Sequence, residues 1–473
     1  MKQNLLEKMR KGERLAFGQQ LLLIFQLSIP AIMAQISSIV MQYIDASMVG
    51  QLGAKDSASI GLVSSSTWLM GGLCSAASIG FTVQIAQRIG AGEEKRARNI
   101  VRQGLLAVLV FSLLLCLLGA GLSGVLPRWL GGGADICKNA SRYFFVYALS
   151  LPAIQMNNAA GGMLQCSGNM RLPSVLHIFM CILDVIFNSV LIFPTRKMSL
   201  FGAEFFCPGA GLGVTGAALG TALAEVFVAS LMLYFLLVKS PMLHLRKGEK
   251  TGFKREDLRK AVKIAVPVGF EQVVMCGAQI MSTKIVAPLG TVAIAANSFS
   301  VTAESLCYMP GYGIGTAATT LIGQSIGAGR KDMTRRLGWL ATCLGMAVMA
   351  GTGVLLYAFA PFMIGILSPD EAIRALGTKV LRIEAFAEPM YAASIVASGV
   401  FRGAGDTLIP SCMNLFSMWG IRIPLGAFLA PRFGLEGVWV AMCLELCVRG
   451  ILFLFRLAGK RWYQGAEGKR KGA

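Results

Sequence analysis

Two aspartates interrupt otherwise apolar stretches of this sequence. Asp45 lies near the end of one hydrophobic run, and Asp184 lies in the middle of another, with Asn188 four residues later. Residues four apart share one face of a helix, so this carboxylate and this amide point to the same side. An aspartate at the centre of a transmembrane helix costs about 2.5 to 3.5 kcal/mol on insertion scales, so it needs a reason to be there. If the helices that carry them line one cavity, both carboxylates and the amide converge on one cation, and Thr221 in a third apolar stretch offers another oxygen.

This set of oxygens predicts a cation-coupling site. Two neighbouring carboxylates in a low dielectric cannot both stay ionised without a partner, so one takes a proton or a cation lies between them. If the cation is sodium, Asp45 and Asp184 are its expected ligands. No cofactor is expected beyond a sodium ion or a proton as coupling ion. The alternative is that each aspartate is hydrogen-bonded within its bundle or lies in a wet vestibule.

Further polar, aromatic and methionine side chains in apolar stretches are candidates for a substrate cavity. Glu225 could join the acidic set, although a helix-end ion pair or a hydrogen bond between lobes explains it equally well. Lys284 beside Glu271 or Glu304 could form a neutral buried pair of structural value. The residues assigned to the cavity are Gln42, Asn157, Asn158, Glu225, Glu271, Glu304, Tyr308 and Met309.

The composition requires most of the chain to face lipid. Of 473 residues 55% are hydrophobic and 14% charged, and the mean hydropathy is +0.63; a soluble globule cannot hide that many apolar side chains. Windows of about 19 residues predict twelve spans, each long enough for a hydrocarbon core of about 30 Å. They lie near 20–44, 57–80, 103–126, 143–166, 173–193, 214–238, 263–287, 293–320, 337–359, 380–403, 410–430 and 436–457.

The chain is also an internal duplication. Residues 27–98 can be laid on 264–335 without a gap at an offset of 237, so that Pro30 falls on Pro267, and the register continues to Pro152 on Pro389. Such repeats are typical of secondary transporters. The predicted fold is all-α, with two pseudo-symmetric lobes of six transmembrane helices. The expected division is a cytoplasmic segment 1–18, an N-lobe 19–238, a linker 239–262, a C-lobe 263–457 and a basic tail 458–473.

The acidic set is not duplicated. Under the same offset Asp45 falls on Ser282, Asp184 on Ile421 and Asn188 on Leu425. The predicted cation-coupling site therefore belongs to the first lobe only.

The distribution of positive charge predicts the orientation. The net charge is +20, and 31 of the 44 Lys and Arg residues fall in segments that are cytoplasmic if both termini are inside. This bias is the positive-inside rule, and anionic lipid headgroups account for it without nucleic acid. We expect a multi-pass protein of a prokaryotic inner membrane, a monomer, with lipids and small amphipathic cations as partners.

Three local features carry separate predictions. The stretch 256–260 in the linker is either a short amphipathic surface helix or a solvated loop, and 194–213 is an external loop or hairpin. Pro310 and Gly311 predict a hinge in the eighth span, because proline frees a carbonyl and glycine allows bending. The twelve cysteines show no CxxC; Cys137 and Cys207, in outer loops, could pair, but buried structural cysteine is the default.

Several motifs resemble one transporter family. They are Ile-Pro-Ala at 29–31, Ile-Asp-Ala-Ser-Met-Val-Gly at 44–50, Gln-Arg-Ile-Gly-Ala-Gly at 87–92, Gly-Gln-Ser-Ile-Gly-Ala-Gly at 323–329, Asn-Asn at 157–158 and Gly-Val-Phe-Arg-Gly-Ala-Gly-Asp at 399–406. In this order and twofold repetition they resemble the multidrug and toxic compound extrusion (MATE) family over nearly the whole chain. The resemblance implies a V-shaped pair of six-helix lobes that alternates between inward and outward openings. It also implies efflux of organic cations in exchange for sodium ions or protons.

The resemblance extends to individual positions. Asp45 matches the first-helix aspartate of the branch that couples through the N-lobe, the DinF-like branch, and Asn157 and Thr221 match polar positions there. The family's fifth helix usually reads Asn-x-x-x-Asp, whereas here Asp184 stands at the Asn place and Asn188 at the Asp place. The acidic positions of the NorM-like C-lobe fall on Met275 and Tyr391, so the resemblance implies no cation site there.

The leading hypothesis is therefore a secondary active multidrug efflux transporter, an antiporter that works by alternating access. A lipid-linked oligosaccharide or lipid flippase of the same superfamily is the alternative, but it should have a basic, arginine-lined cavity. A polytopic membrane enzyme is less well supported, because neither His177 nor His244 has a carboxylate within four residues. A channel is a further alternative, but no filter-like loop repeats between the halves.

Overall fold

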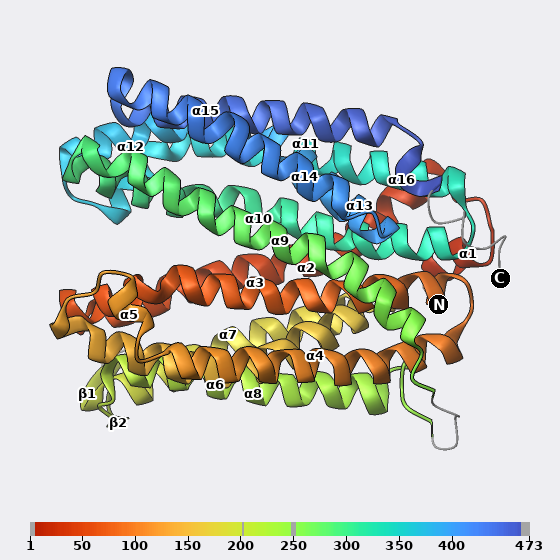
Figure 1. Cartoon of the computed structure of the whole chain (residues 1–473), viewed down its shortest axis with the longest axis horizontal. Coiled ribbons are helices and arrows are strands. Elements are labelled where there is room, and N and C mark those ends of the chain that lie inside the picture. Colours follow the sequence, from red (N-terminus) through yellow and green to blue (C-terminus); the bar gives the residue numbers. More distant parts are fainter. Residues whose placement is uncertain (1–4, 201–202, 247–251, 465–473) are drawn as a thin grey trace. The chain divides into compact units, whose positions relative to one another are not determined.

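The computed structural model describes residues 5–200, 203–246 and 252–464, and within these ranges its regular secondary structure is helical apart from one short hairpin (Figure 1). The chain forms two compact units that do not coincide with its two halves. One unit, here called the Asp45 unit, comprises Ser37–Thr82 and Glu94–Val262. The other, the Glu271 unit, comprises Met1–Ile36, Val83–Glu93 and Lys263–Ala473. Three of the four boundaries therefore fall within long helices, and the fourth falls where α4 begins.

The Asp45 unit is a bundle in which α6 and α8 are central. α6 packs against α4 and α8, and α7 packs along α8. Its elements are the second part of α2 (Phe17–Gly50), most of α3 (Ala54–Gly90), α4 (Glu94–Leu122), α5 (Leu126–Trp129), α6 (Ala134–Cys166), α7 (Arg171–Ile192), α8 (Gly213–Tyr234) with the π-helical turn Phe235–Lys239, and the start of α9 (Arg255–Val286).

The stretch between α7 and α8 is a hairpin, which confirms one of the two predicted forms. β1 (Pro194–Leu200) pairs with β2 (Ala203–Ala210) in antiparallel register. A side chain at Gly209 would come within 2.2 Å of the Phe193 carbonyl oxygen, so the close approach of β2 to the end of α7 requires glycine there. Cys137 is a free thiol, whereas the side chain of Cys207 lies outside the described part of the chain.

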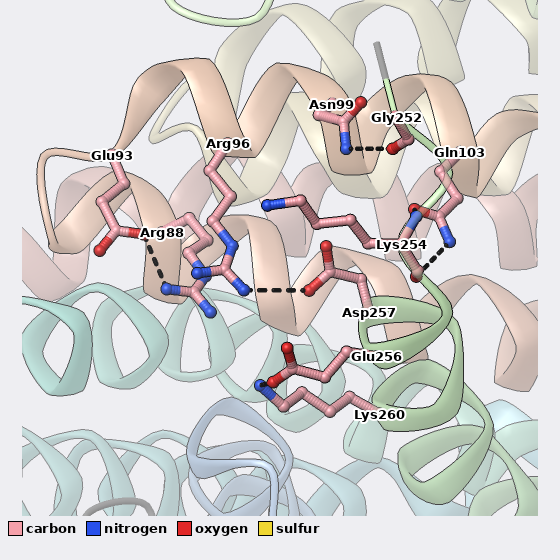
Figure 2. Close-up of polar contacts among 10 residues, drawn as sticks. All are labelled: Arg88, Glu93, Arg96, Asn99, Gln103, Gly252, Lys254, Glu256, Asp257 and Lys260. Carbon is pink, nitrogen blue, oxygen red and sulfur yellow. Dashed lines mark hydrogen bonds and ion pairs between the residues drawn. The ribbon is translucent and has the colours of Figure 1, made fainter. Parts of the chain in front are cut away.

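The prediction for 256–260 is wrong in both of its forms. These residues are the first turns of α9, which continues without interruption into the predicted seventh span. Hydropathy alone predicts that the span starts near residue 263. The helix begins earlier, at Arg255, because an ion pair holds its first turn. The buried Asp257 carboxylate lies 3.5 Å from the Arg96 guanidinium of α4 (Figure 2).

Side chains of α4 also hold the linker that precedes α9. The Asn99 amide donates to the Gly252 carbonyl at 3.0 Å, and the Gln103 amide donates to the Lys254 carbonyl at 2.9 Å (Figure 2). In return, the Lys254 backbone N–H donates to the Gln103 side-chain oxygen at 3.3 Å. Polar side chains at the start of α4 thus satisfy backbone groups that a solvated loop would leave to water.

The other arm of the linker is held by the same helix. The Arg98 guanidinium donates to the Met242 carbonyl at 3.2 Å, and the Arg102 guanidinium donates to the Arg246 carbonyl at 3.0 Å. Both described ends of the linker are therefore fixed to α4. Residues 247–251, between these ends, lie outside the described ranges.

The Glu271 unit is built around α10 and α13, which pack along each other and against α11. A Cβ atom at Gly399 would lie 2.3 Å from the Gly315 carbonyl oxygen, so α13 and α10 meet at their backbones. Besides the first part of α2, the end of α3 and most of α9, its elements are α1 (Leu5–Arg10), α10 (Thr291–Gly327), α11 (Lys331–Leu367), α12 (Glu371–Glu384), α13 (Glu388–Ala404), α14 (Leu408–Ser417), α15 (Ile423–Ala458) and α16 (Arg461–Gln464), with short turns at Ala287–Leu289 and Met418–Arg422.

The predicted spans agree with the observed helices. Each of the twelve segments coincides with helical structure, and eight helices in the described ranges meet both length and hydropathy criteria for a membrane span. Two differences have local causes. The segment near 380–403 is divided between α12 and α13, and the last two segments merge into one helical run that bends at Gly434, whose φ of 59° is left-handed. The fold is that of an all-α, polytopic membrane protein.

Candidate functional site

The two acidic residues that the sequence singles out meet inside the Asp45 unit. Asp184 and Asn188 lie on one face of α7, and each is only 1% exposed. The Asn188 amide donates to Asp45 Oδ1 at 2.9 Å and to Asp184 Oδ2 at 3.1 Å. Asp45 comes from α2, is partly buried, and has its carboxyl group next to that of Asp184. The predicted convergence of the first and fifth helices therefore exists in the structure.

The hydrogen bonds leave part of this network unsatisfied. Within the described structure, Asp184 Oδ1 and Asn188 Oδ1 are buried and accept no hydrogen bond. An unpaired buried polar atom costs about 1 to 3 kcal/mol, and more if it carries charge. Two adjoining carboxyl groups that share one neutral amide thus call for a proton or a cation.

Thr221 adds a further oxygen to the set. It lies on α8 beside the Asp184 carboxyl group, and its hydroxyl donates to the Ala217 carbonyl at 3.2 Å. Since this bond uses the hydroxyl proton, the oxygen's lone pairs remain available to a cation. Carboxylate and hydroxyl oxygens suit hard cations such as sodium, and the donor set of Asp45, Asp184 and Thr221 fits one. In the residues that the structure describes, no group of three or more His, Cys, Asp or Glu could hold a metal ion.

Glu225 belongs to the same region, one helical turn after Thr221 on α8. Its carboxylate accepts a hydrogen bond of 2.8 Å from the buried Asn157 amide of α6, and it lies close enough to Asp184 for an electrostatic interaction. Both bonded residues belong to the Asp45 unit, so neither a helix-end ion pair nor a hydrogen bond between lobes accounts for Glu225. Gln42 and Asn158 are exposed and lie outside this network.

A histidine that the sequence analysis left unused lies on the same face of α7. His177 Nε2 is 2.7 Å from the Ser38 hydroxyl of α2. Positions 177, 184 and 188 recur on one helical face, as 38 and 45 do on α2. The spacing alone could have indicated that α2 and α7 meet along this seam.

In the Glu271 unit, Glu271 is fully paired. It accepts hydrogen bonds from the Ser411 hydroxyl at 2.8 Å and the Asn414 amide at 2.7 Å, and the Arg402 guanidinium lies 3.7 Å away. The predicted pair of Lys284 with Glu271 or Glu304 is wrong, because Lys284 is exposed. Glu271 instead meets partners from α13 and α14.

Sequence reasoning missed Glu445. This fully buried carboxylate of α15 lies 2.7 Å from the Arg422 guanidinium and 2.9 Å from that of Arg449, and it accepts a hydrogen bond from Ser417. The i,i+4 spacing of Glu445 and Arg449 in an apolar segment was the available signal.

Three further buried acids of this unit lie near one another, and two of them, Glu304 and Glu384, also lie near Arg422. Glu304 of α10 is buried and interacts electrostatically with Arg422 and Arg449. Glu384 and Glu388, on either side of the break between α12 and α13, are fully buried, and none of their oxygens has a hydrogen-bond partner among the described atoms.

The aromatic candidate Tyr308 is part of a ring cluster. Its ring centroid is 5.9 Å from that of Tyr312 and 5.5 Å from that of Tyr391, while Met309 beside it is partly buried.

The predicted hinge lies in an unbroken helix. Pro310 and Gly311 are buried within α10, which runs from Thr291 to Gly327. A Cβ atom at Gly311 would lie 2.6 Å from the Met349 sulfur, so this glycine also serves close packing against α11. Bending at this point stays a prediction.

A family model matches both halves of the chain. The MatE model matches residues 30–190 and again residues 267–428. The two matches begin 237 residues apart, which is the offset of the internal repeat.

Known proteins are similar over nearly the full length. "Probable multidrug resistance protein NorM" of Thermotoga maritima is 27% identical over 449 residues, which cover 92% of each chain. "Uncharacterized transporter YisQ" of Bacillus subtilis is 25% identical over 425 residues, covering 89% of this chain and 90% of that protein. A crystal structure of a MATE protein in complex with MaL6 has a TM-score of 0.87 at 19% identity, over 98% of this chain and 100% of that chain. Names of the NorM type predominate among the sequence relatives, so a DinF-like branch stays a prediction.

Proposed function

The chain belongs to the MatE family of membrane transporters, and from this premise we propose that it exports amphipathic organic cations in exchange for sodium ions or protons. It is a multi-pass membrane protein and a transporter rather than an enzyme. Multidrug efflux is proposed because sequence relatives carry the names NorM and MdtK, both described as multidrug resistance proteins.

One observation carries the coupling part of the proposal. Asp45 and Asp184 adjoin and share a single neutral amide from Asn188, and one buried carboxylate oxygen of Asp184 has no hydrogen-bond partner among the described residues. Such a pair tolerates burial only with an exchangeable positive partner. The coupling ion and the exported cation would then compete for the same negative charge, which is the requirement for antiport.

Both coupling ions remain consistent with these residues. A proton needs only the unpaired oxygen of Asp184. A sodium ion would be held by oxygens of Asp45, Asp184 and Thr221, and would supply the positive charge that makes the two carboxylates compatible. Asn188 orients both carboxyl groups in either case through its two hydrogen bonds.

Coupling through the Asp45 unit also supports a DinF-like branch. The sequence places Met275 and Tyr391 where the NorM-like branch is expected to have acids. We further propose that the protein is a monomer of a prokaryotic inner membrane with both termini in the cytoplasm. The bias of Lys and Arg toward one set of loops supports this orientation. The acidic cluster of Asp45, Asp184 and Glu225 disfavours the flippase alternative, which calls for a basic cavity.

Vesicles that contain the purified protein test this function. A fluorescent organic cation is loaded, and its efflux is followed under an imposed sodium gradient or pH gradient, each applied alone. Efflux should accelerate with one of the two gradients and should lose that response in Asp45→Asn. Efflux that ignores both gradients would reject antiport.

A further inference from the structure

Gly220 of α8 lies directly against the Asn188 amide. A Cβ atom built at Gly220 would lie 2.1 Å from Asn188 Oδ1, 3.0 Å from its Cγ and 3.0 Å from its backbone nitrogen. Real Cβ atoms do not approach other atoms to 2.1 Å, so any larger residue here must displace the amide. The space that the amide oxygen occupies exists because residue 220 has no side chain.

This contact differs from its neighbour one turn away. At Gly216, a Cβ atom would meet backbone atoms of α7, with the Leu191 carbonyl oxygen at 2.4 Å. Gly216 therefore governs how closely the two helices pack. At Gly220 the nearest atom, Oδ1 at 2.1 Å, belongs to the Asn188 side chain that connects Asp45 and Asp184, while the closest backbone atom lies at 3.0 Å.

The amide has one orientation that satisfies the carboxylates. Its nitrogen carries both donors, and these reach one oxygen of Asp45 and one of Asp184. Its oxygen must then point to the opposite side, where it is buried without a hydrogen-bond partner in the described structure and faces Gly220. Because the amide is planar, pushing the oxygen away from α8 also moves the nitrogen away from the carboxylates.

We propose that Gly220 is a positioning residue of the cation site, which acts by holding the Asn188 amide with its nitrogen toward Asp45 and Asp184. This inference rests on the proposed function of that site. Gly220 touches neither the coupling ion nor the substrate; its contribution is the space for the amide oxygen.

The primary test compares Gly220→Ala with a matched control in purified, full-length protein. Melting temperature is recorded against sodium concentration and against pH, so that binding of the coupling ion is read without transport. Gly161→Ala on α6 is the control, since its Cβ would lie 3.7 Å from the nearest atom, Met232 Cε, which is ordinary contact. Gly220→Ala should change the apparent affinity for the coupling ion at least about tenfold, the scale of a hydrogen bond to a charged group, and Gly161→Ala should leave it unchanged.

A double-mutant cycle separates positioning from packing. Asn188→Ala removes the amide, so adding Gly220→Ala to it should cause no further change in ion affinity. A further change of the full size in the double variant would overturn the proposal, and so would an unchanged affinity in folded Gly220→Ala. If Gly220→Ala fails to fold, the double variant still tests the proposal. Asn188→Ala removes the amide oxygen with which a side chain at position 220 would collide.

The failure of this proposal is distinguishable from failure of the proposed function. If melting of the parent protein and of Asp45→Asn shows the same dependence on both ions, the cation site itself is refuted. If Asp45→Asn loses the dependence and Gly220→Ala keeps it unaltered, only the role of Gly220 is refuted.

Discussion

Buried carboxylates are handled in opposite ways in the two units of this protein. In the Asp45 unit, two carboxyl groups share one neutral amide, and one Asp184 oxygen has no hydrogen-bond partner in the part of the chain that the structure describes. In the Glu271 unit, the single carboxylate of Glu445 is contacted by two guanidinium groups, those of Arg422 and Arg449. The first arrangement lacks positive charge and the second carries an excess of it.

The difference separates an exchangeable partner from a permanent one. A guanidinium attached to the chain cannot leave, so Glu445 is held in one state and contributes to the architecture. Asp45 and Asp184 have no cationic side chain among their described hydrogen-bond partners, so an external ion must supply the charge. Glu304 and Glu384 lie close enough to Arg422 to interact with it electrostatically.

Removing a carboxylate from the network of Asp45, Asp184 and Asn188, which has no cationic side chain among its described hydrogen-bond partners, should have the largest functional effect. Asp45→Asn leaves the helix packing intact but removes one of the two charges that attract the coupling ion. Resistance of a pump-deficient bacterium to toxic organic cations should fall to the level of cells without the transporter, while the amount of protein in the membrane holds. Full resistance in the variant would show that transport does not need the Asp45 carboxylate, and that the two units do not differ in the way described.

Removing the carboxylate of Glu445, which two guanidinium groups contact, should instead lower the free energy of unfolding. Glu445→Gln removes the carboxylate that contacts both Arg422 and Arg449, and removing one partner of a buried ion pair typically costs about 3 to 5 kcal/mol. Thermal melting in detergent measures this loss. The matched control is Glu436→Gln, since its ion pair with Lys379 is exposed and should contribute less than about 1 kcal/mol. Equal melting of both variants would show that Glu445 is not a structural anchor.

Exchanging the positions of acid and amide on α7 tests whether position or charge matters in the network of Asp45, Asp184 and Asn188. The double substitution Asp184→Asn with Asn188→Asp keeps one carboxylate and one amide on the same face of α7. Partial transport should remain in the vesicle assay, because the charge and the bridging donor are both retained. Complete loss at normal abundance would mean that the positions matter as much as the charge.

The smallest effect is expected from the hydrogen bonds between Gln103 and the linker. Gln103→Ala removes two hydrogen bonds to the backbone of Lys254, each worth about 1 kcal/mol. Hydrogen exchange at the Lys254 amide should accelerate, while exchange within α6 stays the same and ion-dependent transport is retained. Unaltered exchange at Lys254 would show that this contact does not hold the linker.

Much of the helical organisation was predictable because the bilayer imposes it. A chain that spans lipid must satisfy its backbone within each segment, so hydropathy locates helices directly. The start of α9 was missed because its first turn is polar and is held by Arg96 of another helix, which hydropathy cannot detect. The break between α12 and α13 was missed for a related reason, since the apolar pattern continues across it.

The candidate site, like the fold, was predictable only in part. The cost of burying Asp45 and Asp184 predicted that they meet, and they do. Glu445 was overlooked although its partner Arg449 is four residues away in the sequence. Gly220 could not be found at all, since one glycine among 55 carries no signal of what faces it.

The amino-acid sequence by itself determined the duplication, the helical segments and the confinement of the aspartates to one half, because each follows from composition and order along the chain. Only the tertiary structure decided which groups each buried charge contacts. Some of those contacts join residues more than a hundred positions apart, such as Asp45 and Asn188, through distances of about 3 Å that only the packing of helices sets.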